Sequence, residues 1–184
     1  MKEEQTHLFS AQKADTLDSK FRRWLQNPYK ILAPFVQKGM TVMDYGCGNG
    51  YFSIPLSNMV GETGKAYSVD IQKEMLDKLA IKTKALNLSN ISAIKIENKR
   101  LKLPVLIDFA IAIYVVHEIP DQEKFFKEVF ELLKPKGKLL VVEPNFIVSR
   151  QKFNKTLQIA KQVGFIESKS LNLLFSKSRL LCKI

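Results

Sequence analysis

The chain has 184 residues, of which 46% are hydrophobic and 26% charged, proportions that are ordinary for a soluble globular protein. Its two cysteines exclude a disulfide framework, and its longest apolar run, residues 109–116, is too short to span a bilayer. We expect a single domain over residues 1–184, with an N-terminal helical extension at 1–38 and a core at 39–184. Residues 1–10 are polar, which predicts no secretory signal, and the lack of a disulfide framework makes a cytoplasmic protein the expectation.

The net charge is +11, from 29 basic and 18 acidic residues. The lysines are spread along the chain, and no run of five or six like charges occurs. This pattern fits a solvated basic surface, or an anionic partner such as RNA, an acidic membrane or a phosphorylated substrate. We favour the solvated surface because no motif of mixed aromatic and basic residues accompanies the charge.

The predicted elements begin with a helix at 16–26 that has one apolar side, followed by a short helix at 28–36. Within the first helix, Arg22, Arg23 and Trp24 form a cationic and aromatic cluster. One interpretation is a helix with one apolar face and two solvated arginines. The alternative is a lid that covers a bound ligand.

From residue 41 onward, strands and helices alternate. The apolar patterns predict strands at 41–45, 65–70, 91–96, 107–115 and 138–143, helices at 52–60, 73–86, 121–133 and 151–163, and a closing hairpin of 166–171 with 179–184. Such alternation predicts an α/β fold, with a mainly parallel sheet covered by helices on both faces. Ligands of such folds bind beyond the carboxyl ends of the strands, and Asp44, Asp70 and His117 all fall at such ends.

A glycine-rich turn follows the first of these strands, at Gly46, Gly48 and Gly50. Glycine lets the backbone take positive φ and lie directly against a ligand, and the next helix begins with unpaired N–H groups. The spacing G-x-G-x-G differs from the G-x-G-x-x-G of dinucleotide sites, and a P-loop would need Gly-Lys-Ser/Thr. Asp44 before the turn suits an ammonium group, and Asp70 stands where an acid binds ribose hydroxyls. Together these features suit S-adenosylmethionine.

At this point the chain resembles a known family, the class I S-adenosylmethionine-dependent methyltransferases. Four segments carry the resemblance, in the family's order: residues 44–50, 69–71, 108–113 with 117–121, and 132–144. The resemblance covers roughly residues 28–164, and the chain is similar to the small-molecule branch that includes the quinone C-methyltransferases. The resemblance implies a Rossmann-like methyltransferase fold, whose seven-stranded sheet has the order 3-2-1-4-5-7-6 with an antiparallel last strand.

The resemblance also implies a set of cofactor contacts. Asp44 would lie near the methionine ammonium group, Asp70 would bind the ribose hydroxyls, and Ile71 would contact the adenine face. The remaining predicted contacts are Gly46, Cys47, Gly48, Asn49 and Gly50 in the turn, Glu97 and Asn98 at the adenine amino group, and Tyr114 near the transferred methyl group. Glu97 and Asn98 also fit an ordinary loop, because the family's usual acid at this place is Asp.

His117 follows the end of the central strand, where the family places the transferred methyl group. It is the predicted catalytic residue, as a general base or a group that orients the substrate, although a loop histidine that caps the next helix is the alternative. Cys47 is interpreted as a small residue that fits the turn rather than a nucleophile. No Cys/His cluster has the spacing of a metal site, so we expect no metal.

The predicted function is transfer of the sulfonium methyl group of S-adenosylmethionine to an acceptor that we expect to be a small molecule. One alternative is an RNA-directed methyltransferase, which the basic charge would suit, and another is a module that binds S-adenosylmethionine without turnover. A nicotinamide-dependent oxidoreductase is disfavoured by the glycine spacing and by the absence of a Tyr-x-x-x-Lys pair. The identity of the acceptor and the oligomeric state are left open by these patterns.

Overall fold

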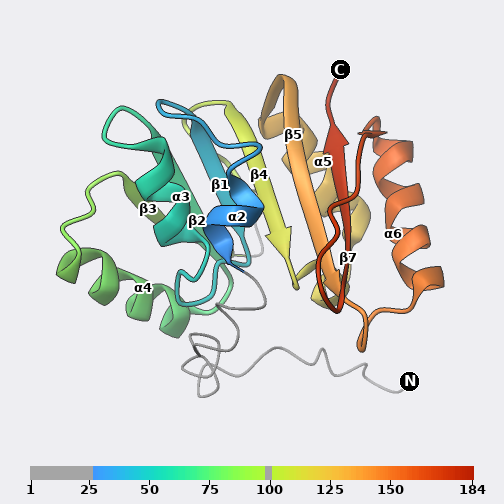
Figure 1. Ribbon diagram of the computed structural model, residues 1–184, viewed down its shortest axis with the longest axis horizontal. Helices are drawn as coiled ribbons and strands as arrows, with labels where there is room; N and C mark the ends of the chain where they lie inside the picture. The colour runs from blue at the N-terminus through green and yellow to red at the C-terminus, as the bar shows by residue number, and fades with distance from the viewer. Residues whose placement is uncertain (1–26, 98–100) are drawn as a thin grey trace.

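The computed structural model describes residues 27–97 and 101–184, and Figure 1 shows how their helices and strands are arranged. One seven-stranded sheet has the order β3-β2-β1-β4-β5-β7-β6, which confirms the predicted fold. The strands are β1 (Thr41–Tyr45), β2 (Lys65–Asp70), β3 (Ile91–Lys95), β4 (Ile107–Ile113), β5 (Leu133–Pro144), β6 (Ile166–Glu167) and β7 (Ser176–Cys182). Strands β1 to β5 pair in parallel, and β7 runs antiparallel to both β5 and β6.

Helices cover both faces of the sheet. They are α2 (Pro28–Leu32), α3 (Ser53–Val60), α4 (Lys73–Ala85), α5 (Gln122–Leu132) and α6 (Arg150–Val163), with a 3₁₀ turn, η2, at Val116–Glu118. Figure 1 shows α2 in front of the sheet and α5 behind it. Because successive side chains of a strand point to opposite faces, Val42 of β1 packs in the core beneath α2 and α3, whereas Met43 packs in the core beneath α5 and α6.

Several boundaries differ from the predicted ones. The central strand β4 ends at Ile113 rather than at residue 115, because Tyr114 takes a positive φ of 61° and η2 follows. Strand β5 begins five residues earlier than predicted, since Leu133 already pairs with Ile107 ahead of a register shift. In the closing hairpin β6 is shorter than predicted, and β7 begins three residues before residue 179.

The helix caps follow the sequence signals. Asp121 accepts a hydrogen bond from the backbone N–H of Lys124 (2.9 Å), which confirms it as the N-cap of α5. Gly164 closes α6 with a φ of 119°, a conformation that favours glycine. The predicted helix at 16–26, with Arg22, Arg23 and Trp24, lies outside the described residues.

The topology gathers the ends of the parallel strands at one edge of the sheet. Strands β1, β2, β4 and β5 all end there, at Tyr45, Asp70, Ile113 and Pro144. Because ligands of such folds bind beyond the carboxyl ends of the strands, this edge of the sheet is the place to look for a site.

In the part of the chain that the structure describes, no helix is both long and apolar enough to cross a bilayer.

Candidate functional site

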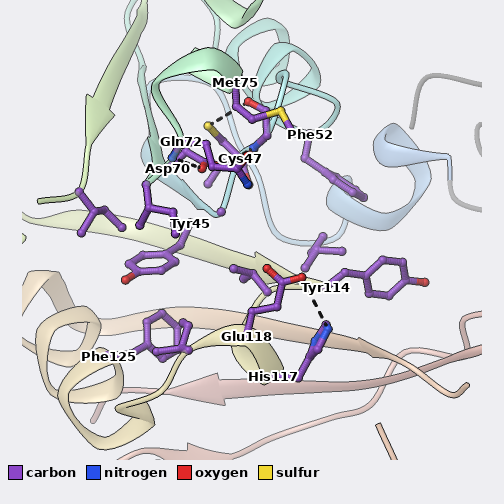
Figure 2. A pocket seen from close by; sticks show the side chains of 18 of the residues that line it. Tyr45, Cys47, Phe52, Asp70, Gln72, Met75, Tyr114, His117, Glu118 and Phe125 are labelled. Carbon is purple, nitrogen blue, oxygen red and sulfur yellow. Dashed lines mark hydrogen bonds and ion pairs between the residues drawn. The ribbon is translucent and has the colours of Figure 1, made fainter. Parts of the chain in front are cut away.

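A cavity of about 890 Å³ opens at the carboxyl edge of the sheet, and Figure 2 shows it from close by. Most of the residues predicted to form the site line this cavity: Asp44, Gly46, Cys47, Gly48, Asn49, Asp70, Ile71, Glu97, Tyr114 and His117. Gly50 is not among the lining residues, and Asn98 lies outside the described part of the chain. Segments far apart in the sequence thus meet around one space that is large enough for a cofactor and a small substrate.

The glycine turn is held against the end of β2. The backbone N–H groups of Gly46 and Cys47 both donate to the carbonyl oxygen of Val69, at 2.8 and 3.0 Å. Gly46 has a φ of 74°, and a Cβ built on it would lie 2.5 Å from Cγ2 of Val115. Gly48 has a φ of 53°, and none of the described atoms lies within 4 Å of its Cβ position. Only a bare backbone fits at Gly46, whereas Gly48 leaves open space beside the cavity.

At Gly50, glycine is required for packing against a helix rather than for contact with the cavity. It takes a φ of 92°, and a Cβ there would lie 2.4 Å from Cδ1 of Leu79, a buried residue of α4. Its lack of a side chain therefore lets the turn pack against α4. The structure gives no support to Gly50 as a cofactor contact, because this residue faces the helix instead of the cavity.

Asp70 connects the end of β2 to the glycine turn. Its Oδ2 accepts a hydrogen bond from the backbone N–H of Gly48 (2.8 Å), and its Oδ1 accepts one from the backbone N–H of Gln72 (2.9 Å). Burial raises the pKa of this carboxyl, which is only 7% exposed, while the backbone N–H groups lower it. Each carboxylate oxygen can accept a further hydrogen bond, so Asp70 can hold the turn and bind a ligand hydroxyl together.

Asp44 and Cys47 border the turn on its buried side. Oδ2 of Asp44 accepts a hydrogen bond from the hydroxyl of Ser53 (2.6 Å), at the first residue of α3. Burial raises the pKa of the Cys47 thiol well above its ordinary value, and the charges of Asp44 and Asp70 raise it further. The thiol therefore stays protonated at neutral pH and is a poor nucleophile.

Figure 2 shows His117 across the cavity from Cys47 of the glycine turn and beside Glu118. Its Nδ1 is 2.6 Å from Oε2 of Glu143, and its backbone N–H donates to Oε1 of the same carboxylate (3.0 Å). Glu143 is the next-to-last residue of β5 and is almost fully buried. On the other side of the ring, Nε2 lies 3.9 Å from Oε1 of Glu118. Because Nδ1 is engaged by Glu143, Nε2 is the ring nitrogen left to exchange a proton with a ligand.

The surroundings of His117 shift its pKa upward. Burial on its own lowers the pKa of the imidazole, but the hydrogen bond and charge of Glu143, with the charge of Glu118, raise it above its ordinary value. Lys152 acts in the opposite direction and lowers it. Since the folded pKa exceeds the unfolded one, the protonated ring stabilises the fold below the unfolded pKa, and this contribution is lost as pH rises through the folded pKa.

We expect a Glu143→Gln substitution to lower the pKa of His117, because the neutral amide removes the charge that favours the imidazolium while the ring stays buried. Lys152→Gln, on the exposed face of α6, should raise the same pKa slightly. A proton NMR titration of the ring measures both shifts, with a His117→Asn variant to assign the signal. An unchanged titration midpoint in both variants would contradict the proposed coupling.

Tyr114 lines the cavity between the glycine turn and β7. Its backbone N–H donates to the carbonyl oxygen of Val142 (2.8 Å), and its hydroxyl is hydrogen-bonded to the hydroxyl of Ser176 at the start of β7. Hydrogen bonds therefore hold both the backbone and the hydroxyl group of Tyr114. Its positive φ turns the chain away from the sheet and leads into the turn that carries His117.

Two further cavity residues escaped prediction from the sequence. Glu128 of α5 is 7% exposed, and its Oε1 has no hydrogen-bond partner among the described residues. Tyr45 packs edge-on against Phe125 at 4.7 Å between centroids, and burial together with the charges of Glu128 and Asp70 raises its pKa to about 12. A buried carboxylate oxygen without a donor is costly, so this wall of the cavity favours a ligand that brings an N–H or O–H group.

The sequence offered a partial signal for Glu143 and Glu128, which were not predicted as site residues. Glu143 is an acid near the end of a buried strand, as Asp44 and Asp70 are, and that position alone could have marked it. Glu128 follows Phe125 by three residues on the buried side of α5, but periodicity cannot tell a buried glutamate from a solvated one. Among the described residues, no group of three or more His, Cys, Asp or Glu is placed to hold a metal ion.

Comparison with known sequences identifies relatives that are named as methyltransferases. The chain is 32% identical over 124 residues to the demethylmenaquinone methyltransferase of Oceanobacillus iheyensis, which covers 64% of this chain and 51% of that enzyme. It is also 32% identical over 137 residues to a ubiquinone/menaquinone biosynthesis C-methyltransferase of Haemophilus ducreyi, covering 71% of this chain and 53% of that protein. The alignments therefore span about half the length of these curated relatives.

Among solved structures, a SAM dependent methyltransferase from Aquifex aeolicus matches with a TM-score of 0.85 and 27% identity, over 96% of this chain and 100% of that one. The sequence profile described as a methyltransferase domain matches residues 36–175, which include every strand from β1 to β6 and the whole glycine turn. The resemblance noted from the sequence motifs is thereby confirmed. The chain belongs to the methyltransferase domain family.

Proposed function

We propose that the protein is an S-adenosylmethionine-dependent methyltransferase that acts on a small-molecule acceptor. The observation that carries the proposal is the bare backbone of the glycine turn at the cavity wall, with Asp70 bonded to Gly48 and Asp44 directly before the turn. Membership of the methyltransferase domain family supports the same assignment. When bound, the cofactor supplies a methyl group on a positively charged sulfur, which is already activated for transfer.

Within this proposal, the chain binds the cofactor through two carboxylates and the turn between them. Asp70 accepts hydrogen bonds from the ribose hydroxyls, and Asp44 lies near the methionine ammonium group. The backbone from Gly46 to Asn49 lies against the ligand. Ile71 and Glu97 contact the adenine, and Tyr114 faces the methyl group.

The acceptor that fits best is a hydroquinone-type aromatic ring. The curated relatives are named for methylation of demethylmenaquinone and related quinones. Apolar residues including Ile113, Phe146 and Phe175 line the same cavity as His117, so an aromatic ring would find both apolar contacts and one ionisable partner in it. Above its pKa, His117 can accept the proton of a ring hydroxyl on Nε2, while Glu143 stabilises the imidazolium that results.

A methyl-transfer assay tests the proposal. The protein is incubated with cofactor labelled in its methyl group and, separately, with a short-chain 1,4-naphthohydroquinone, a lipid extract and total RNA. We expect label in the hydroquinone or the lipid extract. Label in RNA alone would contradict the small-molecule acceptor, and label in none of the three would favour a module that binds the cofactor without turnover.

A His117→Ala variant should lower kcat in this assay by about 10²- to 10⁴-fold, the range that general acid–base groups supply. Its affinity for S-adenosylhomocysteine should stay within about twofold of the wild type, because His117 lies across the cavity from the glycine turn. A variant that kept full kcat would remove His117 from the chemistry while leaving the cofactor site in place.

A further inference from the structure

Four large apolar side chains stand exposed at the mouth of the cavity. Phe146 is 80% exposed, Ile147 54%, Leu174 58% and Phe175 61%, and all four also line the cavity. We call these four residues the apolar rim. Single exposed apolar residues are common on protein surfaces, but a group of four around one opening is typical of an interaction surface.

The apolar rim is held in place by hydrogen bonds between its two loops. The loop after β5 and the loop before β7 are joined by the backbone N–H of Asn145, which donates to the carbonyl oxygen of Phe175 (2.8 Å). The ammonium group of Lys177 adds bonds to the side chain of Asn145 (2.8 Å) and the carbonyl oxygen of Val148 (2.7 Å). Val148 is buried in the core directly behind the rim. The exposed side chains are therefore presented by an anchored backbone.

Basic residues are concentrated in the C-terminal segment that carries the apolar rim. Residues 145–184 contain eight Lys or Arg and one acid, Glu167, so this segment carries a net charge of +7 out of the +11 of the whole chain. Arg150 and Lys152 follow the rim directly and are exposed in the first turn of α6, where the helix dipole favours acids. The charge of Lys152 reaches the cavity, since it acts on His117. These basic residues lie where they do not stabilise their own helix, which is consistent with a role toward an outside partner.

We propose that the apolar rim, with Arg150 and Lys152, docks the mouth of the cavity onto a bilayer surface that carries anionic lipid headgroups. Aromatic and aliphatic side chains insert into the headgroup boundary, and basic side chains pair with the anionic headgroups around them. The docking surface deepens the proposed function, on which its biological meaning rests, because a lipid-borne acceptor would enter the cavity directly from the bilayer. It also gives a use to the basic charge, which the cofactor does not explain.

Other partners fit the apolar rim less well. A second copy of the chain would bring Arg150 and Lys152 of each copy together beside the two rims, and like-charge repulsion opposes this association. An RNA could use the charges and stack bases on Phe146 and Phe175, but it would leave the exposed aliphatic surface of Ile147 and Leu174 without a use. A bilayer uses the apolar and the basic side chains together.

Vesicle sedimentation tests the docking surface on the full chain. Wild-type protein is mixed with vesicles of phosphatidylcholine alone, and with vesicles that contain about one third phosphatidylglycerol. We expect binding to the anionic vesicles at least about tenfold tighter than to the neutral ones, weakening as NaCl rises from about 0.1 M to about 0.5 M. The double variant F146D/F175D should lose at least about tenfold of that binding, and R150E/K152E at least about fivefold.

Ile81→Asp is the matched control, because Ile81 is 71% exposed on α4 and is not among the residues that line the cavity. It should bind anionic vesicles like the wild type. Equal vesicle binding by all variants, or wild-type protein that ignores vesicles, would overturn the proposal. So would rim variants that change only RNA binding or only the oligomeric state.

The affinity of each variant for S-adenosylhomocysteine separates this proposal from the proposed function. Rim variants that keep this affinity while losing vesicles are folded and support the docking surface. Wild-type protein that binds vesicles through the rim but does not bind S-adenosylhomocysteine would leave the docking surface standing and remove the proposed function.

Discussion

An Asp70→Ala variant is expected to bind S-adenosylhomocysteine at least about 100-fold more weakly than the wild type. Hydrogen bonds to a charged group contribute about 1.5–3 kcal/mol each, and the two ribose hydroxyls would lose both of theirs. The variant also removes the hydrogen bond from the backbone N–H of Gly48 to Oδ2 of Asp70 (2.8 Å), which holds the glycine turn in place. Isothermal titration calorimetry measures the loss.

Asp108→Ala is the matched control for this experiment. Asp108 also accepts a backbone hydrogen bond, from Thr41 (2.8 Å), and it pairs with Lys134 (2.7 Å), but it is not among the cavity residues. Its loss should lower the free energy of unfolding without changing the affinity for S-adenosylhomocysteine. If Asp70→Ala and Asp108→Ala bound the ligand equally well, the assignment of Asp70 to the ribose would be wrong.

A Gly48→Ala variant is expected to lose roughly 10- to 100-fold of the affinity for S-adenosylhomocysteine. The added methyl group would occupy space beside the cavity, where we propose that the ligand lies against bare backbone, and overpacking of this kind costs about 1–3 kcal/mol. Calorimetry measures the affinity, and urea unfolding measures the stability of the same samples.

Gly61→Ala separates the two effects. Gly61 has a φ of 68°, close to the 53° of Gly48, and among the described atoms nothing lies within 4 Å of either Cβ position. Alanine is strained at both positive φ values, so both variants should lose free energy of unfolding. The loss should be at least as large for Gly61→Ala, because its ψ of −174° places Gly61 in a region that is essentially restricted to glycine. Only Gly48→Ala should lose ligand affinity. Equal affinities in the two variants would place the ligand away from the turn.

The parts of the site that could be predicted from the sequence are local ones. Residues 44–50 carry an acid, a strand end and a glycine turn within seven positions, and the turn needs the positive φ that Gly46 and Gly48 take. Asp70 ends the next strand, and parallel pairing of β1 with β2 brings it to the turn. The order of the strands came from the family resemblance, and the structure confirms it.

The parts that could not be predicted depend on contacts between distant segments. Glu143 supports His117 because β5 lies beside β4, and the sequence separation of 26 residues gives no hint of that bond. In the sequence Gly50 is indistinguishable from the other turn glycines, and only the structure shows that α4 packs against it. Tyr114 ends the central strand by its backbone conformation, although its sequence continues an apolar run. In each case the deciding interaction comes from tertiary packing.

Calorimetric titration of the full chain with S-adenosylhomocysteine, and separately with NADH, tests the central claim most directly. If the turn at residues 46–49, flanked by Asp44 and Asp70, binds a sulfur-containing nucleoside, the first ligand should bind one to one with a Kd in the micromolar range and the second should give no saturable heat. Binding of NADH at equal or higher affinity, or no heat with either ligand, would contradict the proposed cofactor site and the methyltransferase activity that depends on it.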